Sequence, residues 1–215
     1  MKKSNSRKKV AVAMNIMVII LEIIGLYYNL TSELGIRNLK YYTVLSNIFA
    51  MVMSIMFVVN YLRQKNEEQC TVPKQLTRLK YSACTCLAVT FVVVVTVLIP
   101  SYGISSAKGY LLEGANLYQH VLCPFAAIIS FCFFEKDEKM TIKDNLLILL
   151  PTIGYAIIAL ILNFAKLLHG PYPFLYVYEQ PVYMSFVWLV VILSMAYVLA
   201  LILRVINGKG NKAKS

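Results

Sequence analysis

The sequence is dominated by six apolar segments of about 20–23 residues, separated by short polar connections. A helix of that length crosses the roughly 30 Å hydrocarbon core of a bilayer. Lipid offers the backbone no hydrogen-bond partners, so these segments are expected to be helices. The predicted helices span residues 10–30, 40–62, 79–99, 115–134, 145–165 and 182–204. The chain is therefore predicted to be all-α: a polytopic membrane protein in which residues 1–215 form a single six-transmembrane-helix bundle.

The composition excludes the main soluble classes of protein. Hydrophobic residues make up 59% of the chain and charged residues only 14%, against about 25% charge in an ordinary globular domain. A disordered chain is poor in apolar residues, so disorder is excluded as well. The first segment has a basic flank like that of a signal peptide, but its apolar run is too long and no small-residue cleavage site follows. We expect it to be retained as a helix.

The formal net charge of +11 would suit a nucleic-acid partner, but the positions of the charges argue against one. Seventeen of the 21 Lys and Arg residues lie in the N-terminal tail, the second and fourth connections and the C-terminal tail. These four regions share one side of a six-span chain. The positive-inside rule then predicts cytoplasmic N and C termini in a multi-pass protein of the cell membrane. For the basic tails, the anionic membrane lipids are sufficient partners, and no nucleic acid is expected.

Tyrosines are concentrated at the predicted outer face. Eleven of the 15 fall at outer helix ends or in outer connections. One interpretation is an aromatic belt at the membrane interface. A belt forms at both faces of a membrane, however, so the excess at one face also favours a pocket there.

Two ionisable residues, Glu22 and His120, are predicted to lie inside the spans, where charge is expensive and usually functional. Weaker polar residues share helix faces with one another or with His120: Thr43, Ser46, Asn47 and Ser54 on the second helix, and Asn116 on the fourth. At ~1.5 Å per residue, Thr43 lies ~5 Å, His120 ~6–9 Å and Glu22 ~12 Å from the outer helix ends. These depths allow all three side chains to meet in the outer half of one bundle.

Pro124 gives a second reason to examine His120. A proline within a helix has no N–H and clashes with the carbonyl four residues earlier, which here belongs to His120. We expect a kink at this point, with the freed carbonyl either buried in protein or hydrated. The alternative is a kink without chemistry.

Thr43 and His120 together suit nucleophilic catalysis. A hydroxyl needs a general base within hydrogen-bond reach, and histidine is the usual base because its pKa lies near working pH. The first N–H groups of the second helix, with Asn38 as the expected N-cap, and the hydroxyls of Tyr41 and Tyr42 would face the developing oxyanion. The alternative for Thr43 is structural, because threonine often forms hydrogen bonds between membrane helices.

Three short stretches carry a resemblance to a known family. They are Tyr-Tyr-Thr-Val-Leu-Ser-Asn (41–47), Asn-Leu-Tyr-Gln-His-Val-Leu-Cys-Pro (116–124) and Pro-Tyr-Pro-Phe-Leu (171–175). With the six spans, they resemble the androgen-induced-gene family of integral-membrane threonine hydrolases, and the chain looks closest to its bacterial branch. The resemblance covers nearly the whole chain. It implies hydrolysis of fatty-acid esters of hydroxy fatty acids, with Thr43 as the nucleophile and His120 as the base.

Further polar residues are expected to support this pair. Ser46, Asn47 and Asn116 would orient His120 or water, or else form interhelical hydrogen bonds. Glu22 would hold the second imidazole nitrogen, as the third member of a triad does, or else remain a structural carboxylate.

Three residues near the predicted outer surface are expected to bind the substrate. Arg37 and Lys40 would meet a substrate carboxylate at the mouth of the pocket, or else be solvated interface charges. Tyr172 is expected to shape the outer connection and to contact the substrate.

The sequence thus predicts a threonine-type ester hydrolase that acts on a lipid substrate from the bilayer. No metal or organic cofactor is expected, because the sequence has no Gly-rich phosphate loop, no ligand cluster and only two histidines. Two alternatives remain open. One is a small-solute or proton-coupled transporter or channel that uses Glu22 and His120. The other is a non-catalytic lipid-binding or scaffold protein, in which the Thr43 hydroxyl is dispensable.

Overall fold

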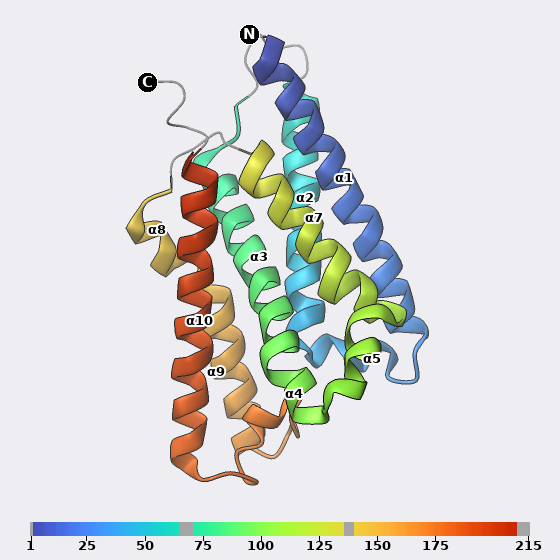
Figure 1. The fold of residues 1–215 in the computed structure, drawn as a ribbon, viewed down its shortest axis with the longest axis vertical. Helices are drawn as coiled ribbons and strands as arrows, with labels where there is room; N and C mark the ends of the chain where they lie inside the picture. The colour runs from blue at the N-terminus through green and yellow to red at the C-terminus, as the bar shows by residue number, and fades with distance from the viewer. Residues whose placement is uncertain (1, 65–70, 136–139, 210–215) are drawn as a thin grey trace.

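The computed structural model describes residues 2–64, 71–135 and 140–209, and these residues form helices with no strand among them. Within these ranges six helices are long and apolar enough to cross a membrane, as the sequence predicts. They cover Ser6–Thr31, Tyr42–Arg63, Lys74–Tyr102, Gly114–Phe134, Ile142–Phe164 and Val182–Gly208. Figure 1 shows them gathered into one elongated bundle. The prediction of an all-α, multi-pass membrane protein is confirmed, whereas the direction of insertion and the kind of membrane remain predictions.

Three of the described spans are continuous helices and three are assembled from shorter elements. The continuous ones are α1 (Lys2–Thr31), α2 (Tyr42–Arg63) and α10 (Val182–Lys209). The third span joins α3 (Lys74–Val93), the π-helical turn η2 (Val94–Leu98) and α4 (Ile99–Tyr102). The fourth joins α6 (Gly114–Asn116), the π-helical turn η4 (Leu117–Leu122), α7 (Cys123–Ile129) and the π-helical turn η5 (Ser130–Phe134). The fifth joins α8 (Ile142–Leu147) and α9 (Leu150–Phe164).

The two ends of the bundle differ in what they carry. The first turns of α1 and the last turns of α10 lie at the same end of the bundle, the upper end in Figure 1, which we call the terminal end. The opposite end, called the site end, carries three connections. These contain η1 (Gly35–Lys40), η3 (Ile104–Ser106) with α5 (Ala107–Leu112), and η6 (Pro173–Leu175). The crossing helices thus return the chain to the end at which it begins.

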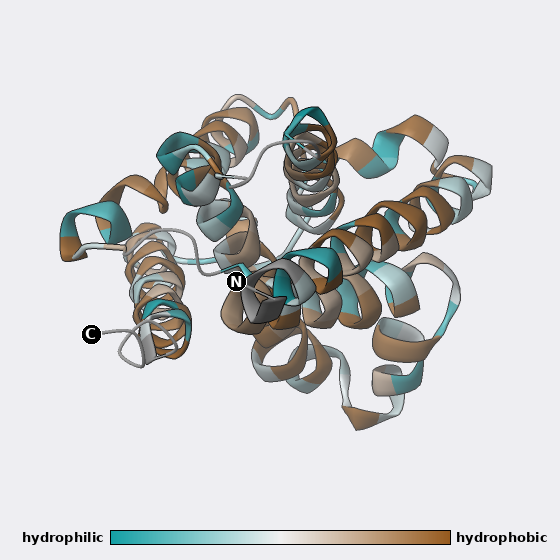
Figure 2. Ribbon diagram, turned by 90° about the horizontal axis from the view of Figure 1, so that it is seen from above, coloured by the Kyte–Doolittle hydropathy of each residue, from teal (hydrophilic) through white to brown (hydrophobic). Residues whose placement is uncertain are grey.

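The third span is the most enclosed part of the bundle. Within its most apolar stretch 72% of the residues are buried, against 17% in the sixth span. Small residues on α3, including Ala83, Cys84, Cys86 and Ala88, let neighbouring helices approach closely. Seen along its length, the bundle consists of predominantly apolar helices (Figure 2). The outward faces of helices such as α10 are therefore suited to contact with lipid.

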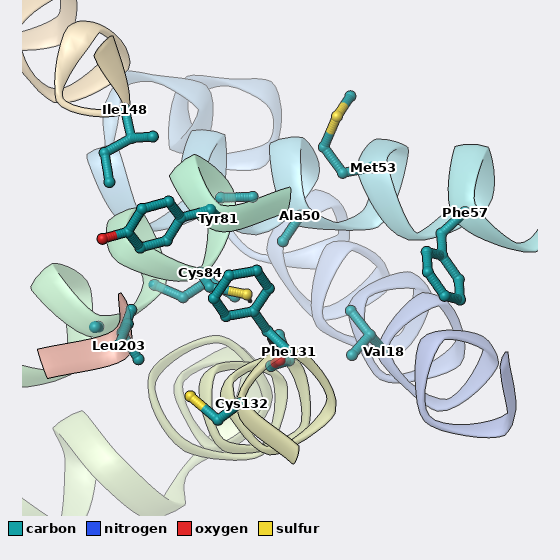
Figure 3. Packing of buried hydrophobic residues seen from close by; sticks show 14 of the residues in the cluster. Val18, Ala50, Met53, Phe57, Tyr81, Cys84, Phe131, Cys132, Ile148 and Leu203 are labelled. Atoms are coloured by element: carbon teal, nitrogen blue, oxygen red, sulfur yellow. Dashed lines mark hydrogen bonds between the residues drawn. The ribbon is translucent and has the colours of Figure 1, made fainter. Parts of the chain in front are cut away.

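Tyr81 joins four helices in the core of the terminal half (Figure 3). Its ring stacks on that of Phe131, with centroids 5.4 Å apart. Its hydroxyl donates to the carbonyl of Ala200 at 2.5 Å and lies 3.0 Å from Oδ1 of Asn145. The apolar ring and the polar tip of this fully buried side chain are both satisfied, as burial in lipid requires.

A buried polar cluster that sequence reasoning missed lies between α1, α3 and the end of the fourth span. Nζ of Lys80 is 3.2 Å from Oε1 of Glu135, and the two side chains are 3% and 4% exposed. Lys80 also donates to Asn15, while Asn15 and Ser130 both donate to Glu135, at 2.8 and 2.6 Å. The expectation of only two ionisable residues within the spans is therefore wrong. Lys80 is tolerated there because a carboxylate neutralises it.

Removing one partner of this buried pair should destabilise the protein strongly. Lys80→Met is expected to lower the free energy of unfolding by about 3–5 kcal/mol, because Glu135 would keep a buried charge without its partner. The double variant Lys80→Met/Glu135→Gln should lose less, because a neutral amide replaces that charge. Unfolding in detergent micelles measures both, with the exposed Lys143→Met as the matched control. Equal losses in the single and double variants would contradict the charge pairing.

Candidate active site

Thr43 lies in the first turn of α2, close to the site end. The preceding Tyr41 is extended (φ −82°, ψ 134°), and its carbonyl accepts the N–H of Leu45 at 3.2 Å. The N–H of Thr43 therefore comes before the first intrahelical hydrogen bond and is available to another partner. The start of α2 thus presents a hydroxyl and a backbone donor side by side.

The predicted N-cap role of Asn38 is wrong. Asn38 lies in η1, a short helix that separates it from the start of α2. Its amide donates to the carbonyl of Asn29 and to the hydroxyl of Ser32, both at 2.9 Å. The side chain consequently stabilises the turn after α1, whereas Tyr41 is the N-cap residue of α2.

His120 lies in the π-helical turn η4, four residues before Pro124. The N–H of Cys123 bonds to the carbonyl of Tyr118, five residues back, where an α-helix would use the fourth. Because Pro124 has no N–H to offer the carbonyl of His120, the helix absorbs the break in this wider turn. The disruption expected at Pro124 is thus a π-helical turn, a feature found frequently at functional sites.

The structure brings the side chains of Thr43 and His120 together inside the bundle. Nε2 of His120 lies 3.3 Å from Oγ1 of Thr43, and the two residues are only 5% and 8% exposed. Nδ1 of His120 lies 2.6 Å from the backbone carbonyl oxygen of Tyr110. A carbonyl can only accept, so Nδ1 carries the proton and Nε2 carries the lone pair. This tautomer lets Nε2 accept the hydroxyl proton of Thr43, as a general base must.

The carbonyl of Tyr110 is a site feature that sequence reasoning missed. It comes from α5, and a backbone carbonyl leaves no signal in the residue type. Asn116 donates to the carbonyl of Gly109 at 3.0 Å and so holds α5 against the start of the fourth span. Gly114 (φ +52°) provides the turn between them, in a conformation that glycine adopts without strain. Asn116 thus acts on His120 indirectly, by fixing the segment that supplies its acceptor.

Glu22 does not take the third place of a triad, and that expectation is wrong because the Tyr110 carbonyl occupies it. Glu22 is fully buried, and its Oε1 accepts the side-chain amide of Gln119 at 2.8 Å. Gln119 in turn accepts from the amide of Asn29 at 2.7 Å. Glu22 therefore positions the residue adjacent to His120 and leaves the imidazole to other partners.

Asn47 and Ser46 fix the backbone of Thr43. The amide of Asn47 donates to the carbonyls of Thr43 and Gln119, both at 2.9 Å, and so joins α2 to η4. The hydroxyl of Ser46 donates to the Thr43 carbonyl at 3.0 Å and pairs with that of Thr90 at 3.1 Å. Ser46 and Asn47 thus form the interhelical hydrogen bonds that were the alternative to a catalytic role. By fixing the backbone of Thr43, these bonds also set the distance between the two reactive side chains.

Tyr172 reaches Thr43 from the connection before α10. Its hydroxyl oxygen accepts the N–H of Thr43 at 3.4 Å, and its ring stacks on Phe174 at 5.2 Å. Burial raises the pKa of Tyr172 to about 12. The phenol consequently keeps its proton at ordinary pH and has it available to donate.

A large cavity, which we call the chamber, opens beside this pair at the site end. Its volume is about 820 Å³, and His120, Thr43, Gln119 and Asn116 are among its lining residues. Six tyrosines also line it: Tyr28, Tyr41, Tyr102, Tyr110, Tyr172 and Tyr176. The pocket expected from the excess of tyrosines at one end of the bundle is therefore present, while the aromatic belt stays a prediction.

A second, smaller cavity of about 60 Å³ lies between α3, α9 and α10, and we call it the slot. Apolar side chains such as Val93, Trp188 and Ile192 form most of its wall. Three residues line both the slot and the chamber: Thr43, Leu98 and Tyr172. The hydroxyl of Thr43 is thus situated where a polar and an apolar compartment adjoin.

The remaining predicted residues lie at the margin of the site. The hydroxyl of Tyr42 is 2.7 Å from that of Thr152 on α9, so its predicted oxyanion role is wrong, whereas Tyr41 lines the chamber. Lys40 lines a separate groove between α2 and α9, and Arg37 is exposed on η1. For these two residues the contact with a substrate carboxylate stays a prediction.

Comparisons with protein-family models, curated proteins and solved structures each returned no match. Among the described residues there is also no group of three or more His, Cys, Asp and Glu side chains suited to a metal ion. The site is accordingly characterised by its own geometry: a buried Thr–His pair, an imidazole anchored by a backbone carbonyl, and two adjoining cavities.

Proposed function

We propose that the protein is an intramembrane ester hydrolase in which Thr43 is the nucleophile and His120 the general base. The observation that carries the proposal is the 3.3 Å contact between Nε2 of His120 and Oγ1 of Thr43, with Nδ1 tied to the Tyr110 carbonyl. A hydroxyl becomes an effective nucleophile when a base is within hydrogen-bond reach and a third group orients that base. Here the orienting group is neutral, which avoids placing another carboxylate in the membrane.

The first half of the proposed reaction forms an acyl-threonine. Nε2 of His120 takes the hydroxyl proton while Oγ1 of Thr43 attacks the ester carbonyl carbon. Tyr172 would donate its phenolic proton to the oxyanion, since its hydroxyl lies beside Thr43 and accepts the Thr43 N–H. The tetrahedral intermediate then collapses, and the imidazolium returns its proton to the departing alkoxide, which leaves as an alcohol.

The second half regenerates the enzyme. A water molecule from the chamber gives a proton to Nε2 and attacks the acyl carbonyl carbon. Collapse of the second intermediate returns the proton to Oγ1 of Thr43 and releases the fatty acid. The net reaction consumes one ester and one water and yields one acid and one alcohol, with no cofactor required.

The location of the site favours a lipid substrate. The reactive pair is buried within membrane-spanning helices, and one of its two cavities is apolar. A long-chain ester can keep its chain among apolar side chains while its polar part occupies the chamber. The family resemblance narrows this class to fatty-acid esters of hydroxy fatty acids or similar long-chain esters. The substrate would come from the membrane, which we propose to be the cell membrane, with both termini cytoplasmic.

The transporter alternative has less support from the geometry. It needs Glu22 on a water-filled path, but Glu22 is fully buried and its carboxylate is bonded to Gln119, which itself lines the chamber. A non-catalytic lipid-binding protein would have no need of the Thr43–His120 contact. Both alternatives predict that the Thr43 hydroxyl is dispensable, so substitution of Thr43 discriminates the hydrolase from both of them.

Loss of either reactive side chain should abolish hydrolysis of long-chain esters. Thr43→Ala and His120→Ala are each expected to lower kcat by about 10³-fold or more, because neither group acts alone. Thr43→Ser keeps a hydroxyl and should retain measurable turnover. The assay uses purified protein in detergent with a panel that includes a fatty-acid ester of a hydroxy fatty acid.

The control for this assay is Thr96→Ala, which removes an exposed hydroxyl from another helix and should leave turnover unchanged. Thermal unfolding establishes that each variant folds. Hydrolysis that survives Thr43→Ala in a folded protein would overturn the proposed nucleophile.

Removing the phenolic hydroxyl next to Thr43 should affect the chemical step more than binding. Tyr172→Phe is expected to lower kcat by about 10²-fold with little change in KM, which is the loss typical of one oxyanion donor. The exposed Tyr178→Phe serves as the control and should match the wild type. An unchanged kcat in Tyr172→Phe would show that the oxyanion is stabilised by other donors.

A further inference from the structure

The slot and the chamber differ in polarity, and the reactive residue Thr43 lines both of them. The chamber is lined by polar and apolar residues together, six tyrosines among them, whereas the slot is lined mostly by apolar side chains. His120 lines the chamber and Thr43 lines both cavities. An ester bound at Thr43 therefore has two chemically distinct directions in which its halves can extend.

The slot is built from matching stripes on three helices. On α10 the lining residues are Ser185, Trp188, Leu189, Ile192 and Leu193, which recur with helical periodicity on one face. Residues of α3 and α9 line it with similar spacing, so the slot runs along the helix axes. From Ser185 to Leu193 the stripe covers ~12 Å at ~1.5 Å per residue. This length and the small volume of about 60 Å³ suit a straight hydrocarbon chain.

A continuous aromatic wall connects the slot to the reactive pair. The ring of Tyr172 stacks on Phe174 with centroids 5.2 Å apart, and Phe174 lies 5.7 Å from the ring of Trp188 on α10. Tyr172 is also the residue whose hydroxyl meets the N–H of Thr43. The wall therefore leads from the site of bond cleavage to the side of the slot that α10 lines.

The position of His120 decides which half of the ester enters which cavity. In the proposed reaction the imidazolium must protonate the departing alcohol oxygen, so that oxygen has to lie on the side of His120. His120 faces the chamber, and the water for the second half-reaction is admitted there as well. The alcohol half must consequently occupy the chamber, which leaves the slot for the acyl half.

We infer that the slot is the acyl-chain site of this enzyme and selects unbranched acyl chains, while the wider chamber takes the alcohol half of the ester. This inference rests on the proposed hydrolase function and goes beyond it by assigning each half of the substrate to a cavity. It follows that branching and bulk are tolerated on the alcohol side and rejected on the acyl side. Acyl-chain length is read by the residues that close the slot, among them Ile192.

The test changes the slot without touching the reactive pair. Ile192→Phe places a phenyl ring in the slot, and its neighbour Val191→Phe places the same ring at an exposed position on α10. Both variants are assayed with 4-methylumbelliferyl esters of straight acyl chains from four to sixteen carbons, so that the alcohol half stays constant. A second series holds an acetyl group constant and lengthens the alcohol.

Ile192→Phe is expected to lower the ratio of kcat/KM for the hexadecanoyl ester to that for the butanoyl ester at least tenfold, whereas Val191→Phe keeps the wild-type ratio. The preference of Ile192→Phe along the alcohol series should match that of the wild type. The wild type should also discriminate against methyl branches on the acyl chain and accept them on the alcohol. A changed alcohol preference with an unchanged acyl preference would reverse the assignment and overturn the inference.

A binding measurement separates failure of the inference from failure of the proposed function. A straight sixteen-carbon fatty acid with a diazirine in its chain is photolysed with the protein, and labelled peptides are mapped by mass spectrometry. Labelling of residues 185–193, reduced by Ile192→Phe and retained in Val191→Phe, supports a chain-binding slot. If that labelling occurs while no ester is hydrolysed, the hydrolase proposal fails and the slot remains a lipid site. If esters are hydrolysed without slot labelling, the acyl-site inference alone is overturned.

Discussion

The bilayer requires every buried polar group to find its partner within the protein, and α1 meets this requirement along one face. Asn15, Glu22 and Asn29 recur every seven residues on that face, and each bonds to a polar side chain of the fourth span or its end. Gly25 lies between Glu22 and Asn29, where a Cβ would come within 3.0 Å of Cγ of Gln119. The absence of a side chain there allows the two helices to approach closely. Pairing of α1 with the fourth span thereby fixes the segment that contains His120.

From that pairing the geometry of the site follows in short steps. Gln119 is held by Glu22 and Asn29, its carbonyl accepts the amide of Asn47, and the same amide holds the carbonyl of Thr43. The two reactive residues are thus joined through their backbones before their side chains meet. The imidazole is oriented by a backbone carbonyl in place of a carboxylate, so the pair adds no buried charge to the membrane. Such a neutral pair can lie next to an apolar slot without the free-energy cost of burying a charge.

Much of this organisation could be predicted from the sequence. The six helices follow from the length of the apolar runs, and the approach of Thr43 to His120 is consistent with their similar depth in two spans that start at the same end of the bundle. The hydrogen-bond partners that the structure shows for Glu22 and Tyr42 could not be predicted, because the depth and the helix face of a polar group do not identify which neighbour it bonds. The Tyr110 carbonyl carries no residue-type signal. Lys80 resembles a loop charge in a count of basic residues, and its role emerges only when Glu135 is seen beside it.

The central claim is that Oγ1 of Thr43 becomes acylated during turnover. The most direct measurement is mass spectrometry of protein quenched in acid while it hydrolyses a long-chain ester, with the modified peptide sequenced. The account predicts an added acyl group on Thr43, which disappears in Thr43→Ala and on completion of turnover. An acyl group on another residue, or turnover with no acylated intermediate at any quench time, would contradict it.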